Sequence, residues 1–123
     1  MQEKTGSWPT ESKVYRFAEM SVRKNANGSE SRDFGGGALT TGERIRVHQT
    51  KQVAGLPPNP AHAIAHTEFI CVREGTLEFT HDGKTDRAEA GDVLFVAKGS
   101  MHQVRNVGAE PASYFVVAIG GDV

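Results

Sequence analysis

Short apolar or alternating segments separated by turn residues fill the second half of the chain. Residues 76–80 alternate apolar and polar side chains, which predicts a half-exposed strand, whereas residues 93–96 are continuously apolar, which predicts a buried one. Further strand patterns are found at residues 43–49, 67–73, 102–106 and 113–119. Glycines recur at short, even intervals from Gly75 to Gly108, a spacing typical of short strands and tight turns. We therefore expect an all-β sandwich or barrel with little helix.

One turn is predicted from its residues alone. Asp82-Gly83 separates two strand-like segments, and this dipeptide favours a type I′ hairpin turn because both central residues need positive φ. No segment repeats apolar residues at helical spacing, although residues 15–23 leave room for a strand or one short helical turn.

The first 40 residues are polar and rich in turn residues. The segments 25–29 and 35–37 are predicted to be loops around an extended segment at 14–17. We expect residues 1–40 to form an N-terminal extension with one added strand, and residues 41–120 to form the barrel. A strand at 14–17 is suited to join the sheet edge of a second copy, so we expect a homodimer.

Composition narrows the classes of partner. The chain has 123 residues, which favours a single domain, and its 14 Lys and Arg against 15 Asp and Glu give a net charge of -1. This balance argues against nucleic acid and anionic membranes as partners. The polar start has no secretory signal, so a soluble protein is expected, either cytoplasmic or exported after removal of a signal absent from this sequence. A single cysteine, Cys71, excludes an internal disulfide.

Candidate chemistry is concentrated in two patches that begin or end with glycine. The first runs from Gly55 to Gly75 and contains His62, His66 and Glu68. The second runs from Gly91 to Asn106 and contains Gly99 and His102.

Both patches resemble the two motifs of the cupin family, over about residues 40 to 120. In the second motif Gly91, Gly99, His102 and Asn106 are on pattern, and Ala97 stands where the family usually has proline. In the first motif His62, Glu68 and Gly75 are on pattern, but Ile64 occupies the place of the second histidine. The resemblance implies a jelly-roll barrel, also described as a double-stranded β-helix, and a first-row transition metal inside it.

The residues themselves allow His66 to compensate for Ile64. His66 and Glu68 are two residues apart on a predicted strand, so both side chains point to the same face. His62 reaches the same ion only if the chain turns back at residues 63–65, because six extended residues span about 20 Å. The predicted metal ligands are therefore His62, His66, Glu68 and His102, a set that suits iron, manganese, nickel, copper or zinc.

The remaining candidates follow from strand alternation. Ile64, Ile70, Val72 and Phe95 are predicted to line a pocket for a small-molecule substrate or ligand, with Ile70 and Val72 on the face of Glu68 and Cys71 on the opposite face. Glu68 is the candidate catalytic residue, as a fourth metal ligand or as a general base.

Each histidine also has a purely structural interpretation. His102 alone fits a buried side chain bonded to a backbone carbonyl, and His66 alone fits the exposed end of a strand. His81 is expected on the exposed hairpin, and His48 faces either the barrel lumen or solvent. A shared ion or water would satisfy several inward polar groups that are otherwise costly to bury.

Two classes of function remain open. The first is a metal-dependent enzyme of oxygenase, lyase or isomerase type, and the second is a non-catalytic ligand-binding cupin that has lost its metal site. A metal-free epimerase-like cupin with His66 or His102 as base is a third, disfavoured by the few arginines at predicted inward positions. No phosphate-binding glycine loop and no Gly-x-Ser-x-Gly motif occurs in the sequence.

Overall fold

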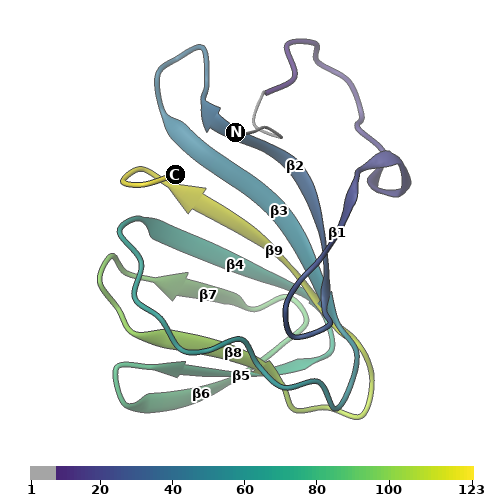
Figure 1. The fold of residues 1–123 in the computed structure, drawn as a ribbon, viewed down its shortest axis with the longest axis vertical. Helices are drawn as coiled ribbons and strands as arrows, with labels where there is room; N and C mark the ends of the chain where they lie inside the picture. The colour runs from purple at the N-terminus through teal and green to yellow at the C-terminus, as the bar shows by residue number, and fades with distance from the viewer. Residues whose placement is uncertain (1–7) are drawn as a thin grey trace.

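The computed structural model describes residues 8–123, and the fold in these residues is almost entirely β (Figure 1). One 3-10 turn, η1 (Phe17–Glu19), is the only helical element in this range. The strands are β1 (Val22–Lys24), β2 (Glu30–Ala38), β3 (Arg44–Gln52), β4 (Thr67–Glu74), β5 (Thr76–His81), β6 (Lys84–Glu89), β7 (Val93–Val96), β8 (His102–Asn106) and β9 (Ala112–Ile119).

The strands form two antiparallel sheets. The larger sheet has the order β1-β2-β3-β9-β4-β7, and the smaller has the order β6-β5-β8. Neighbours in each sheet are often distant in sequence, as where β9 pairs with both β3 and β4. Figure 1 shows the larger sheet curving around until β4 and β7 lie above β5, β6 and β8. The predicted all-β jelly-roll architecture with little helix is therefore confirmed.

The core lies between the two sheets, on the inward faces of alternating strands. Leu77 of β5 and Val96 of β7 are completely buried. On β4, Ile70 and Val72 point inward with Glu68, as the alternation of side chains along a strand requires.

Alternation also corrects the prediction for residues 93–96. Leu94 and Val96 are buried, whereas Val93 and Phe95 are 60% and 55% exposed. Phe95 packs instead on the outer face against Phe69, with ring centroids 5.3 Å apart. Phe95, predicted to line the pocket, therefore lies outside the space between the sheets, because a continuous apolar run does not reveal which sheet face is covered.

The hairpin between β5 and β6 has the predicted turn. Asp82 has φ of 50° and Gly83 has φ of 83°, so both central residues are left-handed, as a type I′ turn requires. The Asp82 carboxylate also accepts hydrogen bonds from Ser100 Oγ at 2.7 Å and the Met101 backbone N–H at 3.1 Å. This turn therefore holds the segment that leads into His102.

The N-terminal region differs from the prediction. Residues 35–37 belong to β2 and pair with β3 rather than forming a loop, and residues 14–17 contain no strand. The indole ring of Trp8 lies so close over Gly35 that a Cβ there would come within 2.9 Å of it, and Trp8 Nε1 donates to Gly37 O at 2.9 Å. The glycines thus provide the space that this ring occupies. The homodimer stays a prediction.

Candidate functional site

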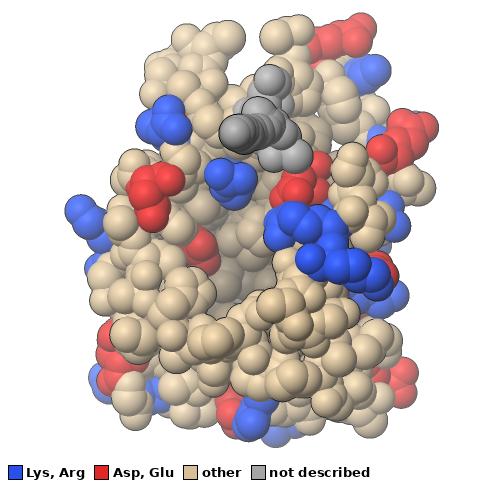
Figure 2. Space-filling model, in the orientation of Figure 1, with Lys and Arg blue, Asp and Glu red and all other residues tan. Residues whose placement is uncertain are grey.

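A cavity of about 230 Å³ lies between the two sheets. Figure 2 shows the molecule hollowed on one face, with basic side chains along one side of the opening. Strands of both sheets and the loop before β4 contribute to its wall. The lining residues are Arg23, Asn25, Ser31, His48, Thr50, Gln52, Asn59, His62, Glu68, Ile70, His102, Gln103, Val104, Tyr114 and Val116.

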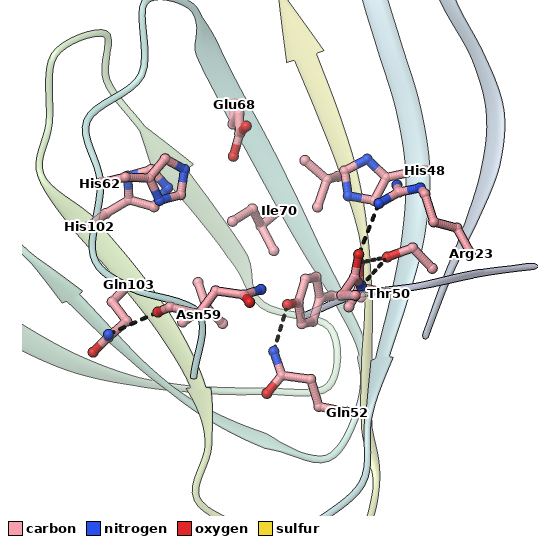
Figure 3. Close-up of a pocket in the computed structure, with 15 residues that line it drawn as sticks. Arg23, His48, Thr50, Gln52, Asn59, His62, Glu68, Ile70, His102 and Gln103 are labelled. Atoms are coloured by element: carbon pink, nitrogen blue, oxygen red, sulfur yellow. Dashed lines mark hydrogen bonds between the residues drawn. The ribbon is translucent and has the colours of Figure 1, made fainter. Parts of the chain in front are cut away.

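Two of the predicted ligands, His62 and His102, lie side by side in this wall (Figure 3). His62 is in the loop before β4, and its backbone pairs with that of His102, with reciprocal N–H to O distances of 3.0 and 2.9 Å. The ring centroids are 4.6 Å apart. The segment before β4 therefore brings His62 to β8, beside His102.

Each of these rings has its Nδ1 against a backbone carbonyl oxygen. The distances are 3.1 Å from His102 Nδ1 to Ser100 O and 3.4 Å from His62 Nδ1 to Pro60 O. A carbonyl oxygen only accepts, so Nδ1 carries the proton and Nε2 of the neutral ring keeps its lone pair. Metal-binding histidines are commonly oriented in this way by their second nitrogen.

Glu68 lies in another part of the wall, on β4, where its carboxylate is held by His66. Glu68 Oε2 is 2.7 Å from His66 Nε2, and the other nitrogen, His66 Nδ1, is 2.5 Å from Asp122 Oδ1. Burial lowers the pKa of His66, but the hydrogen bonds to Glu68 and Asp122 outweigh it and raise the pKa above its ordinary value. The hydrogen bond from His66 lowers the pKa of Asp122.

His66 was expected to face the cavity as a metal ligand, whereas in the structure it lies between two carboxylates. Both of its ring nitrogens face carboxylates, and it is not among the residues that line the cavity. His66 and Glu68 lie on the same face of the strand, as alternation predicts. Their side chains contact each other and do not meet at a shared position inside the cavity.

The predicted apolar lining is divided between the cavity and the core. Ile70 lines the cavity, whereas Val72 and Ile64 are buried in the core cluster outside the lining. Ile64, in the place of the second histidine, accepts a hydrogen bond from the Gly99 N–H at 2.8 Å through its backbone oxygen. Its side chain therefore belongs to the core cluster and not to the cavity lining.

In the arrangement shown, no three His, Cys, Asp or Glu side chains among residues 8–123 converge closely enough to hold one ion. Of the four predicted ligands, the fold brings the rings of His62 and His102 together. Their donor type suits a divalent first-row ion, and Glu68 is a carboxylate in the wall of the same cavity.

Thr50 and Gln52 were not predicted to line the cavity, and His48 was left open between the barrel lumen and solvent. His48, Thr50 and Gln52 alternate along β3, and strand periodicity extended to residue 52 would have placed all three on one face. Tyr114 of β9 accepts a hydrogen bond from Gln52 Nε2 at 2.9 Å, and burial raises the pKa of this tyrosine to about 12.

The N-terminal strands also contribute to the cavity wall. Arg23 of β1 and Ser31 of β2 line it, together with Asn25 between these strands. Arg23 is paired with Asp33, with two nitrogen-to-oxygen distances of 3.0 and 2.9 Å. Residues that the sequence assigned to an extension are thus part of the candidate site, and no local motif marks them.

His48 makes folding stability depend on pH. Burial lowers its pKa from 6.5, and Nδ1 is buried without a hydrogen-bond partner among the described residues. The unfolded chain therefore binds this proton near pH 6.5, and the folded protein binds it only at lower pH, so acidification favours unfolding. We expect the free energy of unfolding, measured with urea, to fall more between pH 7.5 and pH 5 in the wild type than in His48→Gln. The difference should be about 1 kcal/mol for each pH unit by which folding lowers the pKa of His48. Parallel pH profiles would contradict this expectation.

Comparison with known proteins agrees with the fold. The solved structure of a predicted oxalate decarboxylase from Thermotoga maritima superposes with a TM-score of 0.76 at 23% identity, covering 87% of this chain and 98% of that one. An RmlC-like cupin from Shewanella frigidimarina has a TM-score of 0.74 at 16% identity, covering 91% and 94%. The polyketide cyclase RemF from Streptomyces resistomycificus has a TM-score of 0.71 at 17% identity, covering 89% and 80%. These identities show a shared fold and no more.

No curated protein sequence matches the chain significantly. Within residues 8–123, no helix has the length and apolar character needed to cross a membrane. The family model described as "Cupin domain" matches residues 39–118, which is more than half of the chain and contains His62, Glu68 and His102. Because this match includes both of the motifs described above, the chain belongs to the cupin family.

Proposed function

We propose that the barrel cavity binds a small polar organic molecule together with a divalent first-row metal ion held by His62, His102 and Glu68. The observation that carries this proposal is the histidine pair, since both rings have Nδ1 at a backbone carbonyl and Nε2 left for another partner. Two imidazoles placed together, each with Nε2 left for another partner, are suited to share a cation.

The donor set favours iron, manganese, nickel, copper or zinc. Ile64 stands in the place of the second histidine of the first cupin motif. Fewer protein groups would therefore hold the ion, and more of its coordination positions would be open to substrate or water. When bound, such an ion supplies Lewis acidity to the oxygen atoms of a substrate.

The protein's own groups define the remaining chemistry. Glu68 Oε2 is bonded to His66, whereas Oε1 accepts no hydrogen bond within the described residues, so this oxygen is available to a molecule in the cavity. As a base, it would accept a proton from that molecule and is the candidate catalytic group. Tyr114 stays protonated at neutral pH and can donate its hydroxyl proton to a ligand.

Two observations favour a second function, a ligand-binding cupin without a metal. Ile64 is buried in the core, and Glu68 does not converge with the histidine pair in the arrangement shown. A polar ligand with hydrogen-bond donors would then satisfy the two free Nε2 atoms in place of an ion.

Metal content decides between the two functions. We expect protein purified without a histidine tag to contain close to one first-row metal ion per chain by elemental analysis, and to take it up again after removal with a chelator. His66→Ala should retain part of this metal, because His66 contacts Glu68 and not the cavity. Metal-free wild-type protein, even after incubation with each candidate ion, would overturn the metal proposal and leave the ligand-binding cupin.

A further inference from the structure

Asp122, His66 and Glu68 form a continuous chain of side chains from the protein surface to the cavity. The Asp122 side chain is 58% exposed, whereas those of His66 and Glu68 are 14% and 15% exposed. Contacts of 2.5 and 2.7 Å join the three in series. A half-buried carboxylate in the cavity wall is thus connected to an acidic residue outside it.

The loop that carries Asp122 is held in place by independent contacts. The Gly120 N–H donates to Arg44 O at 2.7 Å, and Arg44 Nε donates to Val123 O at 2.6 Å. Gly121 packs so tightly that a Cβ there would overlap the Ala65 carbonyl oxygen. The backbone on both sides of Asp122 is therefore positioned against the segment that contains His66.

The His66 ring links the two carboxylates geometrically. Nδ1 is 2.5 Å from Asp122 Oδ1, and Nε2 is 2.7 Å from Glu68 Oε2. The contact with Asp122 restricts rotation of the ring, and the contact at Nε2 then holds one oxygen of Glu68. The second oxygen, Oε1, is left for the cavity.

We propose that Asp122 is a positioning residue which, through His66, orients the Glu68 carboxylate toward the ligand of the cavity. The orientation of Glu68 depends only on side chains of this protein. The identity of the ligand as a metal ion rests on the proposed function. Removing Asp122 frees the imidazole ring, so Glu68 loses its fixed partner.

Cobalt(II) binding by the full chain tests how much Asp122 contributes to the affinity of the cavity for a metal ion. Outer-shell partners of metal ligands typically contribute 10-fold to 100-fold to affinity, and we expect Asp122→Ala to weaken Co²⁺ binding about 10-fold by titration calorimetry. Asp122→Asn keeps an acceptor for Nδ1 and should recover part of the loss. Asp86→Ala is the matched control, because Asp86 bonds His81 at 2.6 Å in the same way but on the hairpin, and it should bind Co²⁺ like the wild type.

A double-mutant cycle separates positioning from general stability. In a Glu68→Gln background, Asp122→Ala should cause no additional loss of Co²⁺ affinity, because the group it orients is gone. An equal loss in both backgrounds, or no loss in the wild-type background, would overturn the proposal.

An NMR measurement keeps this test independent of metal binding. In the metal-free protein, we expect Asp122→Ala to shift the side-chain carboxyl carbon signal of Glu68 and to remove the Nδ1–H signal of His66, whereas Asp86→Ala changes neither. If the wild type binds no Co²⁺, the proposed metal function fails, and this measurement alone decides the positioning role. A Glu68 signal unchanged in Asp122→Ala would overturn it.

Discussion

Gly75→Ala is expected to lower the free energy of unfolding by roughly 3–5 kcal/mol, combining backbone strain with overpacking. Gly75 joins β4 of the larger sheet to β5 of the smaller one, with φ of 87°. A Cβ there would lie 2.6 Å from Ala112 Cα and 2.7 Å from Pro111 O. Both contacts are with backbone atoms, so relief requires movement of β9, which pairs with the strand that carries Glu68.

Gly83→Ala is the matched control for this experiment. Gly83 has nearly the same φ, 83°, but nothing lies within 4 Å of the place that a Cβ would take there. It should therefore show only the conformational cost, about 1–2 kcal/mol. Urea unfolding of both variants measures the difference, and equal losses would show that the close approach of β9 at Gly75 is unimportant.

The second large effect concerns His102. His102→Ala is expected to weaken binding of the proposed metal ion 100-fold or more, beyond the range found for outer-shell partners, because it removes one of the two assembled donors. Titration calorimetry with Co²⁺ or Zn²⁺ measures the affinity. His102 is only 4% exposed, so the substitution also creates a cavity, and His102→Gln serves as a second variant that keeps most of the volume.

His81→Ala provides the control for that loss. His81 is the partner of His102 across β5 and β8, but it bonds Asp86 and does not line the cavity. Its removal should leave metal affinity unchanged. If His81→Ala and His102→Ala weaken binding equally, the ion is held elsewhere and the site proposed for it is wrong.

Strands and turns that depend only on neighbouring residues were predicted correctly from the sequence. The segment 102–106 matches β8, and 67–73 matches all but the last residue of β4. The Asp82-Gly83 turn followed from the φ values that its two residues tolerate. These features depend on residues within a few positions of one another, which is why sequence alone indicates them.

Patterns were insufficient where a distant residue determines the outcome. The glycine run at 35–37 resembles a loop, yet it forms part of β2 because Trp8 packs over it and β3 pairs with it. Phe95 resembles a core residue, but the outer face of β7 is left open.

The same division applies to the candidate site. Motif spacing and strand alternation are properties of the chain, so they were enough to identify the cupin motifs, to select His62, Glu68 and His102 as candidates, and to place His66 and Glu68 on one face. The contact of His66 with Asp122, 56 residues away, and the place of Arg23 and His48 in the cavity wall became visible only in the folded protein. A side chain's partner depends on which strands the fold brings together, because alternation specifies a face but not what lies opposite it.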